Sequence, residues 1–202
     1  MEPVITVKDV ITFYKADRIL YEMFVAQGME LGTARKAVAF FIWLKQVGKI
    51  TPDTNIINNT TIISTLIAEA ETILCCLQQN DGESSYPEIP LITSLAKNSI
   101  HPGFFNIHKD LIIRGLADII DGIGSYVFND HMYELLCSYE YSKELAAGGW
   151  LGAVSPEVPI ALAKVYAPAM TMLLPEQIRS MFITFDSEFP IDRDEIVQHF
   201  TR

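Results

Sequence analysis

Apolar residues recur at helical spacing from the first residues of the chain onward. The spacing of three and four residues runs through Val7, Val10, Ile11, Tyr14, Leu20, Tyr21 and Phe24. Thr6 followed three positions later by Asp9 is a variant of the capping box, in which Asp replaces the usual Glu. The pattern therefore predicts a first helix that begins after Thr6 and ends at Gly28.

A second helix is predicted from about Thr33 to Gly48. Its sequence, "ARKAVAFFIWLKQVG", is apolar on nearly every side in the middle. A helix with no polar face is normally enclosed by other helices. We therefore expect this segment to form the centre of the core, with Trp43 buried.

Helical patterns continue through most of the remaining chain. Asn59 or Thr60 is expected to cap one helix, and Asn129 or Asp130 another. The predicted helical segments are "TIISTLIAEAETILCCLQQN", "PLITSLAKN", "NIHKDLIIRGLADIIDGIGSYVF", "HMYELLCSYEYSKELAAGG" and "PIALAKVYAPAMTMLLP", the last either continuous or broken before Pro168. Period-two alternation is nearly absent before Pro175, so the sequence predicts an all-α domain of about seven helices over residues 1–178.

The pattern changes in residues 179–202. "MFITF" is a short run of β-branched and aromatic residues, typical of a strand, and "DRDEIVQHF" is typical of a helix. We therefore expect a short C-terminal strand–helix unit after the helical domain. A strand without neighbours would pack on the helical domain or pair with its equivalent in a second chain. The second arrangement would make a homodimer.

This C-terminal stretch resembles the start of an RNA-recognition motif. Met181 to Thr184 match the first four positions of its first-strand signature, and "DEIVQHF" matches its first helix, whereas Phe185 and Asp186 stand where Asn-Leu is usual. The resemblance implies that Phe182 holds a base-stacking position and that Thr184 belongs to the same RNA-binding strand. Three further strands of the motif are absent, so only weak RNA binding is expected.

The N-terminal part resembles a group of largely uncharacterised land-plant proteins. The match lies in "VKDVITFYKADRILYEMFV", "ARKAVAFFIWLKQVG" and "SMFITFDSEFP". In that group a helical domain precedes an RRM-like tail. The resemblance implies the same order of parts here, and no reaction is associated with it.

Composition and charge narrow the range of functions. Hydrophobic residues make up 50% of the 202 positions, enough for one sizeable core with apolar surface to spare for a partner. The net charge of −10 disfavours non-specific nucleic-acid binding through the whole surface.

The chain carries the marks of an intracellular protein, either cytoplasmic or nuclear. Cys75, Cys76 and Cys137 show no disulfide spacing and are expected to be free thiols. The N-terminus lacks the pattern of a signal peptide. No uninterrupted apolar run reaches membrane-spanning length, so no membrane contact is expected. Asn58 and Asn59 head two overlapping glycosylation sequons, which we interpret as a turn and helix cap.

Acidic residues at helical spacing form one candidate site. Asp118 and Asp121 are one turn apart and could hold a divalent cation. Arg114, however, lies four residues from both Asp110 and Asp118, which favours a solvated or partly buried ion network. None of the histidines has a metal-ligand spacing, and neither a metal nor a cofactor is expected.

Aromatic residues give a second candidate. An apolar ligand pocket or a simple core could be built from Phe40, Phe41, Trp43, Tyr86, Phe104, Phe105, Tyr126 and Phe128. The core is favoured. Trp150 either packs its own loop or anchors a partner, and Phe185 is a second candidate partner contact.

The function expected from these features is protein–protein association without catalysis, within an RNA-related assembly if the resemblance holds. The first alternative is a helical protein that binds a small ligand in an apolar pocket. The second is an enzyme built on the acidic face of Asp110, Asp118 and Asp121.

Overall fold

The computed structural model describes residues 4–50, 60–78, 88–96, 100, 103–148 and 157–170. Within these ranges the chain forms nine α-helices and no strand, so the all-α prediction is confirmed. The helices are α1 (Val7–Phe13), α2 (Lys15–Ala26), α3 (Leu31–Gln46), α4 (Thr60–Gln78), α5 (Pro90–Leu95), α6 (Gly103–Ile107), α7 (Lys109–Asp121), α8 (Gly124–Val127) and α9 (Asp130–Ala147).

The first predicted helix is in fact two helices. Thr6 caps α1 as expected, because its hydroxyl accepts from the amide of Asp9 while the Asp9 carboxylate accepts from the amide of Thr6. A break at Tyr14 then separates α1 from α2. Gly28 follows α2 with a φ of +92°, a conformation that glycine adopts at little cost.

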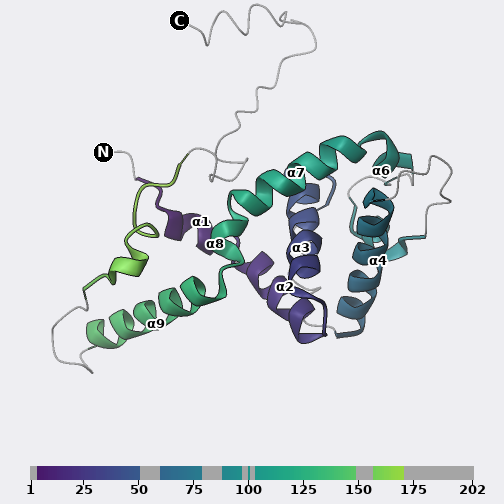
Figure 1. Ribbon diagram of the computed structural model, residues 1–202. Coiled ribbons are helices and arrows are strands. Elements are labelled where there is room, and N and C mark those ends of the chain that lie inside the picture. The colour runs from purple at the N-terminus through teal and green to yellow at the C-terminus, as the bar shows by residue number, and fades with distance from the viewer. Residues whose placement is uncertain are drawn as a thin grey trace, which may run out of the picture.

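Helix α3 is the centre of the fold. It packs against α7, α2 and α4, and Figure 1 shows it between α7 and α4. Every side chain from Ala37 to Leu44 is buried, including Trp43, which is 5% exposed. This burial confirms the prediction of a central helix. The physical reason is that a helix that is apolar on all sides is stable only when its neighbours cover it.

Helix α4 packs against α3 and also contacts α2. In the part of the chain that the structure describes, it is the one helix long and apolar enough to cross a membrane by length and composition. Core helices of soluble proteins pass the same test. The buried Glu69 carboxylate accepts hydrogen bonds from the amides of Leu91 and Ile92, which fixes the start of α5 on α4.

The predicted helix before Pro175 is wrong for residues 159–170. Only the 3₁₀ turn η2 (Ile160–Leu162) forms there. Beyond it the backbone pairs with the N-terminus: the amides of Val7 and Lys8 donate to the carbonyls of Ala167 and Val165 at 3.1 and 2.8 Å. Together with short-range turn bonds, such as that from the amide of Val165 to the carbonyl of Leu162, they form turns and a bend in place of a continuous helix.

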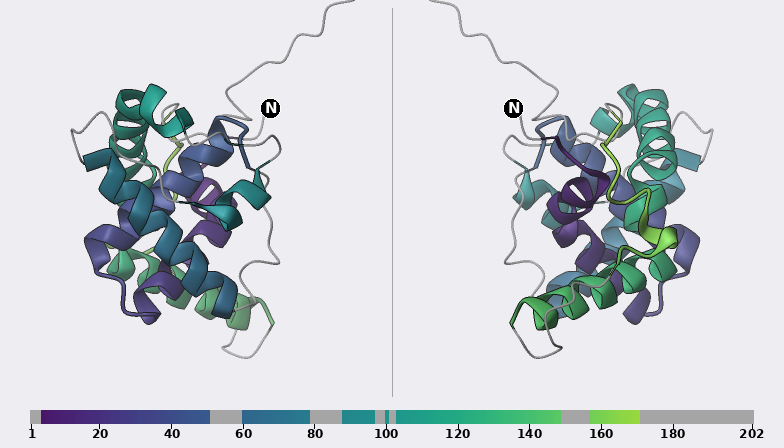
Figure 2. Two further views of the ribbon diagram at one scale, coloured as in Figure 1. Left: turned by 90° about the vertical axis from the view of Figure 1, so that its right-hand side faces the viewer. Right: turned by 90° about the vertical axis from the view of Figure 1, so that its left-hand side faces the viewer.

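The predicted helix over residues 106–128 is also divided, into α6, α7 and α8. His108 separates the first two and Gly122 ends the second. After α8, Asn129 caps α9 by accepting from the amide of Met132, as one of the two predicted caps. Figure 1 shows α9 extending away from the body of the domain, and η2 lies beside it in the right-hand view of Figure 2.

The boundary predicted at residues 178 and 179, and the whole strand–helix unit of 179–202, lie outside the described residues. Their resemblance to an RNA-recognition motif stays a prediction.

Candidate functional site

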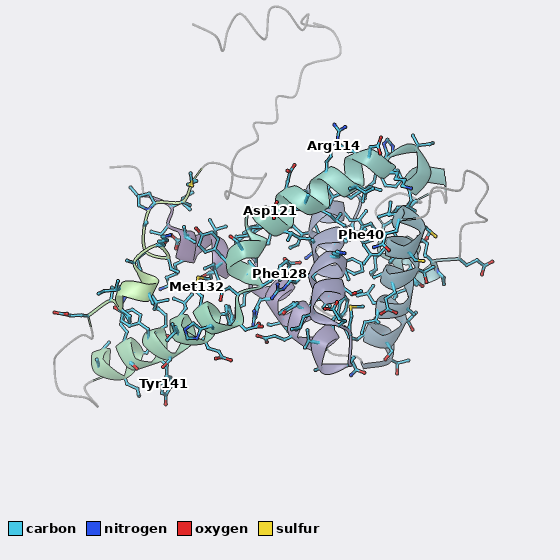
Figure 3. The ribbon with its side chains drawn as sticks, viewed as in Figure 1. Phe40, Arg114, Asp121, Phe128, Met132 and Tyr141 are labelled. Atoms are coloured by element: carbon cyan, nitrogen blue, oxygen red, sulfur yellow. The ribbon has the colours of Figure 1, made fainter. Side chains whose placement is uncertain are left out.

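A cavity of about 380 Å³ opens where α3 and α7 meet α8 and the start of α9. It is lined by Arg35, Ile120, Gly124, Ser125, Phe128, Asn129, Asp130 and His131. Figure 3 labels Phe128 at this junction. The volume falls within the usual range for small-ligand sites.

Close packing of α8 shapes one wall of the cavity. A Cβ on Gly124 would lie 2.9 Å from the carbonyl oxygen of Ile119 and 3.0 Å from the ring of Phe128. Only glycine allows this approach. The ring of Phe128 is held in turn against Tyr21 of α2, at 5.2 Å between ring centroids.

Arg18 of α2 anchors the start of α9 beside the cavity. Its side chain donates to the carboxylates of Glu22 and Asp130 at 2.7 and 2.8 Å, and to the carbonyl of Val127 at 3.0 Å. The guanidinium also lies over the ring of Tyr133, 4.5 Å from its centroid. Asp130, the carboxylate that lines the cavity, is therefore already paired with a buried arginine, which it shares with Glu22.

Arg35 is the cation that faces this cavity from α3. It is partly buried, and its Nε is shielded from solvent without an acceptor. Among the ion pairs formed by described residues, none includes Arg35. A desolvated guanidinium nitrogen without a partner is unfavourable, so the arrangement favours an anion close to Arg35.

Further polar groups sit on the same wall. Asn129 uses its side-chain oxygen to cap α9, so its side-chain amide nitrogen is a donor that the cap does not use. His131 contributes an exposed imidazole. The hydroxyl of Ser125 donates to the carbonyl of Gly122 at 2.7 Å, so its oxygen remains available as an acceptor.

The predicted acidic site lies elsewhere, on the outer side of α7. Asp110, Arg114, Asp118 and Asp121 are all exposed. Figure 3 shows Arg114 directed away from the helices beneath α7. The predicted ion network is wrong, because no ion pair joins these four residues in this structure. Nor do the described residues contain a group of three or more His, Cys, Asp or Glu side chains arranged to hold a metal.

The described members of the aromatic set belong to the core, as the sequence favoured. Phe40, which Figure 3 shows between α3 and α4, contacts Phe105 at 5.9 Å between centroids, and Trp43 contacts Phe104 at 6.2 Å. Of the set, Phe128 lines the cavity. Tyr86 lies outside the described residues.

The described thiols show no sign of activation. Cys75 and Cys137 are exposed and form no disulfide, and burial raises the pKa of Cys76, with neighbouring Cys75 adding to the effect. A raised thiol pKa leaves less thiolate, the reactive form.

The structure does not place the site residues predicted from the resemblance or from partner contacts. Phe182, Thr184, Trp150 and Phe185 lie outside the described residues. Conversely, sequence reasoning missed the grouping of Arg35 with Asn129 and His131. One signal was present: Arg35 lies two residues before Ala37, where the apolar centre of α3 begins.

Comparison with known protein families, characterised proteins and solved structures finds no match to this chain.

Proposed function

We propose that the chain is a non-enzymatic intracellular protein-interaction domain that docks its partner on the outer side of α7. The observation that carries the proposal is an exposed aliphatic pair, Ile107 and Leu111, with exposed fractions of 79% and 55%. With Arg114 and Asp118 they form what we call the α7 face.

Within α7, helical spacing places Leu111, Arg114 and Asp118 on one side, at intervals of three and four residues. Ile107 is the last residue of α6, four positions before Leu111. The core side of α7 is formed by Ile112, Leu116 and Ile119. The α7 face therefore points away from α3, and its aliphatic side chains gain free energy when a partner covers them.

Charge indicates the chemistry of the partner. Asp110, Asp118 and Asp121 surround a single exposed arginine, Arg114. A complementary surface carries aliphatic side chains flanked by Lys or Arg, as on a basic amphipathic helix. We therefore propose such a helix, in another protein, as the occupant of the α7 face.

The link to an RNA-related assembly is implied by the resemblance of residues 180–202 alone. Contact with RNA through Phe182 and Thr184 is part of the proposal only to that extent. The net charge of −10 favours recruitment by a protein over direct binding to a phosphate backbone.

The test uses a labelled amphipathic Leu/Lys helix of about 18 residues, long enough to be substantially helical when bound. The double variant Ile107→Gln/Leu111→Gln should weaken its binding to the full chain about tenfold or more in fluorescence anisotropy. An equally long Leu/Glu peptide should not bind, because its charge matches that of the face.

Ile160→Gln serves as the matched control, because Ile160 is 95% exposed and lies in η2, away from the α7 face. It should bind like the parent chain. Equal losses in both variants would show that general stickiness rather than the α7 face drives binding. Sedimentation gives a further test. If the parent chain is a dimer and the double variant is a monomer, the α7 face binds a second copy of this chain and not a basic helix.

A further inference from the structure

We propose that the cavity beside Arg35 is a binding site for a small organic monocarboxylate. The site is separate from the α7 face and goes beyond the proposed interaction function. It joins α3, α7, α8 and the start of α9, so a ligand there would contact segments far apart in the sequence.

The unpaired charge of Arg35 defines the ligand's polar end. Its guanidinium has no carboxylate partner among the described residues, and its Nε lacks an acceptor. The planar fork of a guanidinium matches a carboxylate with two parallel hydrogen bonds. A bound carboxylate would therefore supply the hydrogen-bond acceptor and the negative charge that Arg35 lacks.

The charges around the cavity favour a single negative charge over two. Asp130 lines the same cavity, and although it pairs with Arg18, a dianion would bring a second negative charge close to that carboxylate. Asn129 and His131, which also line the cavity, carry side-chain groups that can hydrogen-bond to a carboxylate. Phosphate monoesters are thus disfavoured relative to carboxylates.

Size and lining define the rest of the ligand. A volume of about 380 Å³ is larger than a bare inorganic anion requires, and Ile120 and Phe128 supply an apolar wall. A compact apolar body attached to the carboxylate would cover that wall and keep water from the ion pair. Benzoate has both features and serves as the probe.

The experiment titrates the full chain with benzoate by calorimetry, and maps the site by the amide NMR shifts of Gly124 and Ser125. We expect binding with a Kd of about 1 mM or tighter. Benzyl alcohol, which keeps the ring but lacks the charge, should bind at least about tenfold more weakly, and so should inorganic phosphate. Equal binding of benzyl alcohol would overturn the ion-pair argument, and tighter binding of phosphate would overturn the monocarboxylate class.

Arg35→Met removes the charge and keeps the apolar stem. Its benzoate affinity should fall at least about tenfold, whereas Lys36→Met, which removes the exposed neighbouring cation, should stay within about twofold. Equal losses in both variants would show that the overall charge, not this site, attracts benzoate. If benzoate changes the amide NMR shift of Leu111 but not that of Gly124, it binds on the α7 face and the proposed site beside Arg35 is wrong.

Thermal melting without ligand shows whether Arg35 serves to bind the ligand or to stabilise the fold. Because Arg35 has an unsatisfied nitrogen, Arg35→Met should melt within about 2 °C of the parent or above it. A large fall in melting temperature would make Arg35 a structural residue and overturn the proposal.

Arg35→Lys tests the geometry of the ion pair, because lysine keeps the charge but lacks the planar guanidinium. This variant should also bind benzoate more weakly than the parent chain. Unchanged affinity would contradict the bidentate pairing.

Discussion

Gly115 of α7 lies directly against the indole of Trp43 of α3. A Cβ built on Gly115 would stand 2.5 Å from Nε1 of Trp43 and closer still to its Cδ1. No real Cβ sits so near a ring, so the absence of a side chain at Gly115 is what allows α7 to approach the central helix.

The first prediction is that Gly115→Ala destabilises the domain, although alanine is the better helix former. The gain in helix propensity of up to about 1 kcal/mol is outweighed by overpacking, which costs about 1–3 kcal/mol. Denaturant unfolding measures the difference. Trp43→Phe should relieve most of the clash, so the two substitutions together should cost less than their sum.

Gly32→Ala is the control for this prediction, since its Cβ would meet only the flexible carboxylate of Glu30. It should be close to neutral. Strict additivity of the Gly115 and Trp43 substitutions would show that the two residues are not coupled.

The second prediction concerns Arg18, which is 4% exposed and holds Glu22, Asp130 and the carbonyl of Val127. Arg18→Met should cost about 1–3 kcal/mol, because it leaves the carbonyl of Val127 and two half-exposed carboxylates without their partner. Hydrogen exchange should also quicken at the start of α9. Lys15→Met, at an exposed position of the same helix, should change neither quantity. Unchanged exchange in α9 would mean that other contacts hold this helix.

The third prediction concerns the buried pair of Asp17 and Lys45, in which the Lys45 ammonium donates to the Asp17 carboxylate. Burial raises the pKa of Asp17, and Lys45 opposes the rise. Lys45→Met should cost about 2–4 kcal/mol at about pH 7.5, a range discounted for the partial exposure of Lys45.

The sign of the pH dependence follows from the raised pKa. In the variant Asp17 has no cation, so its protonated form becomes the favoured one, and stability is lost as the pH rises through the folded-state pKa. The cost of Lys45→Met should therefore be smaller at about pH 5 than at about pH 7.5. Urea unfolding at both values measures it, with Lys36→Met as the exposed control. If the cost of Lys45→Met does not change with pH, the destabilisation does not come from an uncompensated charge on Asp17.

The fourth prediction concerns Glu140, which joins three segments. Lys8 of α1 pairs with its carboxylate at 2.7 Å, and the Tyr166 hydroxyl donates to it. Both hydrogen bonds lower the pKa of Glu140, and the one from Lys8 has the larger effect. A lowered pKa means stability that is present above the unfolded-state value and lost as the pH falls through the folded-state value.

Glu140→Gln should therefore cost about 1 kcal/mol at about pH 7 and progressively less as the pH falls toward about 4. Glu144→Gln, one turn further along α9 at an exposed position, is the matched control and should show no such pH dependence. If both variants lose stability in parallel across this range, the carboxylate of Glu140 is not held by its neighbours.

The periodic pattern of apolar residues determined the fold class and most helix positions. The cap at Thr6, the end of the first helical unit at Gly28 and the burial of Trp43 followed from local rules, because capping and helical periodicity depend on residues within one or two turns. The same rules placed α3 at the centre, since a helix that is apolar on every side needs neighbours all round.

Tertiary structure alone decided the features that depend on distant residues. Residues 165–169 carry a helical pattern, yet they bond to residues 5–8, because backbone groups at the domain's two ends satisfy each other. The meeting of Arg35 with Asn129 and His131 is of the same kind, as it depends on how α3 crosses α8 and α9. Helical periodicity says which face of a helix is buried but not which helix covers it, so this cavity follows only from the packed structure.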